Sequence, residues 1–119
     1  MELAARIAVL VVALLHVWFL VLEMFLWTRP FGLRTFAQSA EDAERTRVLA
    51  ANQGLYNGFL AAGLAWGAVL GAAGRPIAIF FLGCVLVAGV YGGLTASRTI
   101  LAVQALPGLV ALVLVLLAG

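Results

Sequence analysis

The sequence predicts an all-α fold, in which four transmembrane helices form an up-down-up-down bundle and a single integral membrane domain. Composition is the first reason: of 119 residues, 66% are hydrophobic and 10% are charged, whereas soluble proteins carry about 25% charged residues. The second reason is length, because four apolar stretches approach or exceed the ~20 residues that cross a ~30 Å hydrocarbon core as a helix. These stretches are Leu3–Trp27, Val48–Leu70, Pro76–Thr95 and Thr99–Ala118.

The first helix is expected over residues 3–27. After residue 6, only His16 and Glu23 interrupt the apolar run. A cleaved signal peptide is the alternative interpretation. However, the run is too long, and it ends in Trp27-Thr28-Arg29-Pro30 instead of a small-residue cleavage site. The segment is therefore assigned to the membrane.

The loop Thr28–Arg47 separates the first two predicted helices and holds most of the chain's charges. Pro30 and Gly32 are expected to break the first helix. Ser39 is a suitable N-cap, and the acidic residues that follow it favour the positive end of a new helix. The second helix is therefore expected over residues 48–70, with a start near Ser39 at the aqueous interface.

The third and fourth helices are expected over residues 76–97 and 99–118. Their connections, Gly74-Arg75-Pro76 and Ala96-Ser97-Arg98, are short, and short links make neighbouring helices antiparallel. Pro107 is expected to kink the fourth helix, because it cannot donate to the carbonyl of Val103.

Arginines predict the orientation. The side of the first and third loops carries five arginines and the opposite side carries two, so the richer side is expected in the cytoplasm. Both termini would then be extracytoplasmic, with the chain in a bacterial inner membrane. The first set is Arg29, Arg34, Arg45, Arg47 and Arg98, and the second is Arg6 and Arg75.

Polar side chains of all four predicted helices fall in the same half of the membrane when depth is counted at ~1.5 Å per residue. Ionisable residues within a span face the bundle interior or a water-filled cavity. A polar pocket is therefore expected, with His16 at its floor and Glu23 on its wall as candidate catalytic residues. The candidate ligand-binding residues are Asn52, Gln53, Tyr56, Asn57, Tyr91, Thr95, Arg98 and Gln104.

Each of these residues also has a purely structural interpretation. Glu23 would pair with Arg98 or Arg29, and His16 would hydrogen-bond between helices. The amides would do the same, at ~0.6 kcal/mol per contact. Glycines at four-residue spacing, beginning with Gly54 and Gly58, favour close helix packing within the bundle or in a homodimer.

Several classes of function lack their motifs. The chain has no C-x-x-C, H-E-x-x-H, Walker or Rossmann sequence, and no basic stripe with interleaved aromatics for nucleic acid. It has one histidine and one cysteine, Cys84, which is expected to pack in the membrane. Neither a metal nor a cofactor is predicted, and the expected partner is the lipid bilayer.

The run Leu49–Leu64, with Asn52-Gln53-Gly54-Leu55-Tyr56-Asn57 at its centre, resembles a bacterial family of small integral membrane proteins. That family is the domain of unknown function number 1304, and the resemblance includes His16 and Glu23. It implies four transmembrane helices and no established activity. The chain is also loosely similar in architecture to four-helix families of the DoxX type.

Three functions are compatible with these observations. The first is a membrane protein that binds a small amphipathic or lipid-like molecule in the polar pocket. The second is an intramembrane enzyme, an isomerase or hydratase in which His16 and Glu23 shuttle a proton. The third is an accessory subunit that docks on another membrane protein through its glycine faces.

Overall fold

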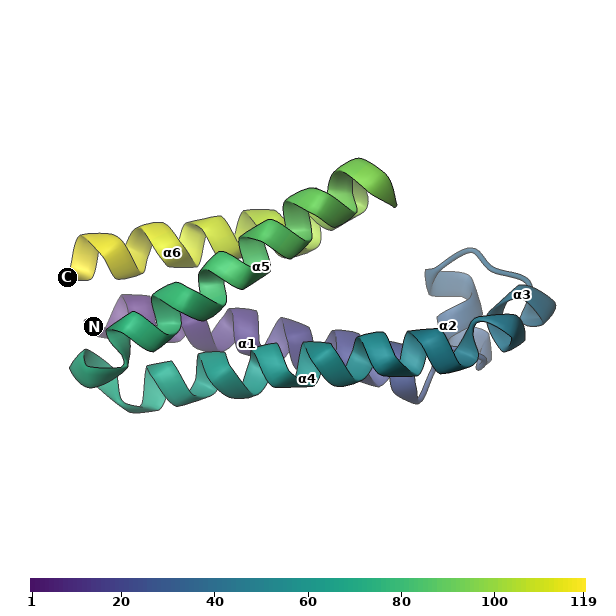
Figure 1. Ribbon diagram of the computed structural model, residues 1–119, viewed down its shortest axis with the longest axis horizontal. Helices are drawn as coiled ribbons and strands as arrows, with labels where there is room; N and C mark the ends of the chain where they lie inside the picture. Colours follow the sequence, from purple (N-terminus) through teal and green to yellow (C-terminus); the bar gives the residue numbers. More distant parts are fainter. The chain divides into compact units, whose positions relative to one another are not determined.

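The computed structural model describes residues 1–119 and consists of helices and their connections, with no β-strand (Figure 1). The all-α prediction is confirmed. The elements are α1 (Leu3–Met24), α2 (Pro30–Thr35), α3 (Ala40–Arg45), α4 (Arg47–Val69), the 3₁₀ turn η1 (Gly71–Gly74), α5 (Arg75–Thr95), the π-helical segment η2 (Leu101–Ala105) and α6 (Leu106–Ala118).

Three helical segments are long and apolar enough to cross a membrane: Leu3–Met24, Gly71–Thr95 and Leu101–Ala118. By length and composition they indicate a membrane protein. α4 has 23 residues, but it is not among these three segments. Its polar run from Asn52 to Asn57 explains its lower hydropathy.

The chain divides into two compact units. The first unit comprises Met1–Leu14 and Leu60–Gly119. In it, the beginning of α1 and the end of α4 share one apolar core with α5 and α6, and burying these side chains stabilises the unit. The core residues are Ala5, Val9, Val12, Ala13, Leu64, Ala68, Ala78, Leu82, Val85, Ala111 and Val115.

Two arginines hold helix ends together in the first unit, at the end where both termini lie (Figure 1). Arg6 Nε donates to the carbonyl of Ala68 at 3.0 Å, near the end of α4. Arg75 donates to the carbonyls of Val115 at 3.3 Å and Leu116 at 3.4 Å, near the end of α6. The last carbonyls of a helix lack intrahelical partners and attract positive charge, so both arginines stabilise C-termini.

The distortion that the sequence predicts beside Pro107 is a π-helical turn. The amide of Leu106 donates to the carbonyl of Leu101, five residues earlier. Pro107 has no amide to donate. The wider turn of η2 therefore comes directly before the residue that cannot continue α-helical bonding.

The second unit, Leu15–Phe59, contains the end of α1, all of α2 and α3, and the beginning of α4. Two expectations are corrected here. α1 ends at Met24, three residues before the predicted end, and Pro30 starts α2 instead of only breaking a helix. Proline is favoured in the first helical turn, where its missing amide has no intrahelical acceptor.

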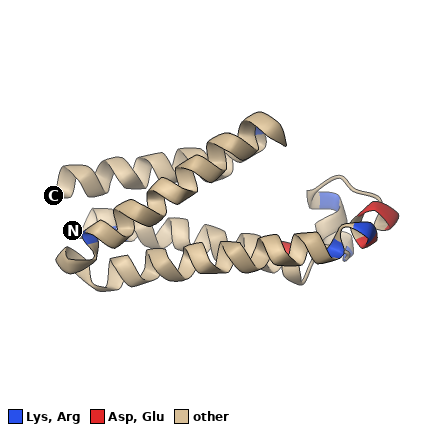
Figure 2. Cartoon of the chain, in the orientation of Figure 1, with Lys and Arg blue, Asp and Glu red and all other residues tan.

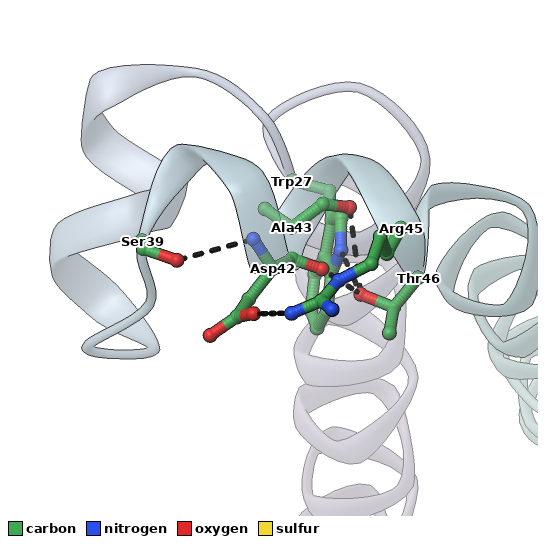
Figure 3. A network of polar contacts seen from close by, with 6 residues as sticks. All are labelled: Trp27, Ser39, Asp42, Ala43, Arg45 and Thr46. Carbon is green, nitrogen blue, oxygen red and sulfur yellow. Dashed lines mark hydrogen bonds and ion pairs between the residues drawn. The ribbon is translucent and has the colours of Figure 1, made fainter.

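The predicted start of the second membrane helix is a separate short helix, α3. Ser39 caps it as expected, since its hydroxyl accepts from the amide of Asp42 at 3.1 Å. Thr46 then interrupts the helix before α4. Its hydroxyl donates to the carbonyl of Asp42 at 3.0 Å and accepts from Trp27 Nε1 at 3.2 Å (Figure 3).

Charged residues gather on α2, α3 and the beginning of α4 (Figure 2). Two ion pairs form among them: Arg45 with Asp42, and Arg47 with Glu44 at 3.1 Å. Both pairs are well exposed, so solvent screening leaves each with little effect on stability.

Candidate functional site

A hydrogen bond joins two of the predicted site residues in the second unit. Asn57 Nδ2, on α4, donates to Glu23 Oε1, on the last turn of α1, at 2.5 Å. Asn57 is 7% exposed and Glu23 is partly buried. The carboxyl group therefore has a fixed partner from a different helix.

Gly54 explains how the two side chains reach one another. A Cβ added at Gly54 would lie 2.7 Å from Cγ of Met24, 3.1 Å from Cβ of Glu23 and 3.2 Å from the carbonyl oxygen of Leu20. A side chain at this position would displace these neighbours, so glycine permits the close approach. Gly54 precedes Asn57 by about one helical turn, so the closest contact of α1 and α4 in this unit lies next to the polar pair.

The second carboxyl oxygen of Glu23 has a different environment. Oε1 accepts from Asn57, whereas Oε2 accepts from no protein group. Among the buried side-chain polar atoms, only Nε2 of Gln38 lacks a hydrogen-bond partner. Because Oε2 of Glu23 also lacks a partner, it is not one of the buried atoms and is accessible at the surface of the unit. A carboxyl group held at one oxygen and accessible at the other is arranged to meet a further hydrogen-bonding group. It makes no ion pair, so the structural alternative in which Glu23 pairs with Arg98 or Arg29 is not observed.

His16 lies on the same helix as Glu23 but does not meet it. The seven-residue separation corresponds to about 10 Å along the helix axis. His16 is fully buried, and its ring packs edge-on against Phe19 with centroids 5.1 Å apart. The structure therefore does not bring the two candidate catalytic residues into hydrogen-bonding distance of each other.

The other polar residues of α4 are exposed. Asn52 donates to the carbonyl of Val48 in its own helix at 2.9 Å. Tyr56 is 58% exposed, and its ring lies 5.9 Å from that of Phe59. Gln53 is also exposed. Of the four predicted residues on this helix, only Asn57 contacts Glu23 in the unit.

The remaining predicted residues belong to the first unit. Thr95 and Arg98 line a hollow of about 260 Å³ at the end of α5, together with Ser97 and residues on either side. Tyr91 is 71% exposed, and its carbonyl accepts from the Thr95 hydroxyl at 2.7 Å. Gln104 is partly buried within η2.

Metal-ligating side chains do not cluster: no group of three or more His, Cys, Asp or Glu residues is placed to hold a metal ion.

α2 and its aromatic contacts were not predicted. The ring of Phe31 packs edge-on against that of Trp18, with centroids 6.0 Å apart. The signal was a proline preceded by Arg29 and followed by two phenylalanines, Phe31 and Phe36, which is compatible with a short helix that begins at Pro30.

The family model described as protein of unknown function (DUF1304) matches residues 10–116. The chain belongs to this family. A protein similar to this DUF1304 chain is the uncharacterized protein YpaA of Lactococcus lactis, which is 32% identical over 97 residues, or 80% of this chain and 82% of that protein. No solved structure matches the chain.

The resemblance to the DUF1304 family is thus confirmed, whereas these matches do not show the likeness to DoxX-type proteins. The matched range includes all ten predicted site residues. Because the DUF1304 description names no activity, the function has to be argued from the chemistry of the site.

Proposed function

We propose that this DUF1304 protein binds a small amphipathic molecule within the membrane, and that Glu23 and Asn57 recognise its polar head. The observation that carries the proposal is the 2.5 Å hydrogen bond between them, which leaves the second oxygen of Glu23 accessible. An ionisable residue in a membrane span is unfavourable unless it is paired or used. Here one oxygen is paired, and the other is available to a ligand.

The chemistry of Glu23 defines the class of ligand. The accessible carboxyl oxygen of Glu23 accepts hydrogen bonds, and the ionised form of the group repels anions. The head group that fits is therefore an amine or a hydroxyl, which supplies N–H or O–H donors. Trp18, Met24 and Leu55 are exposed in the same unit and offer apolar contacts for an alkyl tail. Asn52, Gln53 and Tyr56 are exposed on α4 and available for further contacts.

The membrane setting is part of the proposal. α4 has 23 residues, which correspond to about 34 Å of helix and match the hydrocarbon core. We infer that it crosses the membrane with the three more apolar helices, in alternating directions, as one domain. The arginine count supports a bacterial inner membrane with both termini extracytoplasmic.

An intramembrane enzyme and an accessory subunit are the alternatives. The full burial of His16 and its separation of about 10 Å from Glu23 favour binding over proton shuttling between the two. Gly54 and Gly58 meet Leu20 and Met24 of the same chain, so their spacing is explained without a partner protein. A homodimer through glycine faces stays a prediction.

Three amphiphiles with one alkyl tail each, dodecylamine, dodecanol and dodecanoate, test the function. Each is titrated into the purified full-length protein in lipid nanodiscs, and binding is measured. We expect the amine and the alcohol to bind and the carboxylate not to bind. Glu23→Gln should weaken binding of the amine about tenfold or more, which is the loss of one charge-assisted hydrogen bond. Asn57→Ala should weaken it as well, because the carboxyl group loses its fixed position.

A matched control decides the outcome. Glu2→Gln removes an exposed carboxyl group outside the proposed site. It should bind dodecylamine as the unmodified chain does. Equal binding by Glu23→Gln and Glu2→Gln would show that the Glu23–Asn57 pair is not the recognition site.

A further inference from the structure

α2 folds back beside α1 instead of extending away from it. The ring of Phe31 in α2 contacts that of Trp18, at 6.0 Å between centroids. Trp18 lies six residues before the end of α1 at Met24, or about 9 Å along the helix. If α1 crosses the membrane, the ring of Phe31 therefore lies about 9 Å inward from the end of that span, in the outer part of the hydrocarbon core.

Several contacts fix α2 in this position. The amide of Arg29 donates to the carbonyl of Leu26 at 3.0 Å. A Cβ added at Gly32 would overlap that same carbonyl and approach Cα of Trp27 to 3.2 Å, so the α2 backbone lies directly against the turn after α1. The ring of Phe36 lies 4.8 Å from that of Trp27.

α2 and the residues that flank it combine exposed aromatic rings with unpaired positive charge. Phe31 is 46% exposed and Phe36 is 39% exposed. Arg29 and Arg34 are exposed, and neither forms an ion pair. The arginines of the neighbouring segment differ in this respect, because Arg45 pairs with Asp42 and Arg47 pairs with Glu44.

We propose that α2 lies at the boundary between the headgroup layer and the hydrocarbon core, and that Arg29 and Arg34 bind the phosphate groups of anionic phospholipids. Phenylalanine is common on the apolar face of helices that lie at this boundary, and an anionic leaflet attracts nearby arginines. Guanidinium groups also match phosphate geometry with two parallel hydrogen bonds. This lipid surface is independent of the Glu23–Asn57 pair and of the function proposed for it.

Lipid preference provides the first test. The full chain in detergent is titrated with phosphatidylglycerol and with phosphatidylcholine, and bound lipids are counted by native mass spectrometry. We expect phosphatidylglycerol to bind preferentially, and we expect Arg29→Gln and Arg34→Gln each to lower its affinity about fivefold. Arg29→Lys and Arg34→Lys should retain most of the preference, because the charge is kept.

The paired arginines are the control. Arg45→Gln and Arg47→Gln remove the same charge from the same segment, and we expect them to leave the preference for phosphatidylglycerol unchanged. An equal loss in these variants would overturn the assignment to α2, as would the absence of any preference in the unmodified chain. Millimolar inorganic phosphate should not displace the lipid; displacement would show a site for free phosphate instead.

Depth provides the second test. An environment-sensitive label is attached to Phe31→Cys or to Ala40→Cys, each in a Cys84→Ser background, in vesicles that contain brominated lipids. Ala40 begins α3 and is exposed. We expect the brominated lipids to quench the label at position 31 more than at position 40. Equal quenching, with equal access of aqueous iodide to both labels, would overturn the proposal.

Discussion

Asn57 and Glu23 form a 2.5 Å hydrogen bond beside the point where Gly54 brings α1 and α4 into contact. The polar pair and the helix contact depend on each other, because the amide reaches the carboxyl group only while the backbones stay close. Gly54 and Asn57, one helical turn apart, thus have two different roles in the second unit. Gly54 sets the separation of the helices, and Asn57 satisfies one carboxyl oxygen.

Replacing Asn57 with leucine should destabilise the protein by about 1–2 kcal/mol, because the side chain keeps its approximate size but leaves Glu23 Oε1 without a donor. The measurement is unfolding of the purified chain by SDS in mixed micelles, followed by circular dichroism. Asn52→Leu is the control and should change stability by less than about 0.5 kcal/mol, since Asn52 is exposed. Equal effects would mean that the Asn57–Glu23 bond contributes nothing specific.

Gly54→Ala and Gly83→Ala should shift stability in opposite directions. The new methyl group at Gly54 meets Met24, Glu23 and Leu20, whereas nothing lies within 4 Å of a Cβ at Gly83. The first substitution should cost about 1–3 kcal/mol through overpacking. The second should gain up to about 1 kcal/mol, because alanine favours a helix over glycine. Thermal unfolding of both variants in the same detergent measures these changes. A Gly54→Ala variant as stable as the unmodified chain would contradict the close contact of α1 and α4 at Gly54.

Local signals predicted much of the fold. Apolar length predicted the long helices. Ser39 before three acidic residues predicted a helix start, where its hydroxyl accepts from Asp42, but the helix that begins there is the separate α3 and not the second membrane helix. The prediction for Pro30 and Gly32 was wrong, because both were treated only as residues that break a helix. Pro30 instead occupies the first turn of α2, and Gly32 lets that helix lie against Leu26. The packing against Leu26 is a tertiary contact, which local propensity does not contain.

The sequence predicts the height of each polar side chain along its helix, but not the direction in which the side chain points. Counting residues gives the height of a side chain along a helix, whereas its partner depends on how the helix is rotated against its neighbour. The polar residues of α4 spread over about 140° of its circumference at ~100° per residue. Only Asn57 meets α1 in the second unit, while Tyr56 and Gln53 are exposed. Nothing in the sequence distinguishes these edges.

Asp42 should titrate below its ordinary pKa. The hydrogen bond from Arg45, the hydrogen bond with Ser39 and the charge of Arg45 lower the pKa of this carboxyl group from 3.8. Because the pKa is lower in the folded state, the interactions of Asp42 contribute fully to folding stability above pH 3.8. This contribution is lost as the pH falls through the pKa of the folded state. Carbon-13 NMR of the labelled carboxyl group measures it directly.

Arg45→Gln should raise the pKa of Asp42 toward 3.8, because it removes the largest cause of the shift. Arg47→Gln is the matched control, since Arg47 pairs with Glu44, and should leave the Asp42 titration in place. An unchanged pKa in Arg45→Gln would show that the Asp42–Arg45 pair does not persist in solution.

Ala37→Gly should stabilise the protein by about 1 kcal/mol, the approximate penalty for a left-handed residue with a side chain. Ala37 has a φ of 51° at the end of α2. Its amide donates to the carbonyl of Arg34, and the amide of Gln38 donates to that of Leu33, which is the Schellman pattern that favours glycine. Ala62→Gly, on the exposed face of α4, is the same chemical change in a right-handed helix and should destabilise by about 1 kcal/mol. Thermal unfolding of the two variants under one condition compares them, and a loss of stability in both would mean that residue 37 does not hold the left-handed conformation.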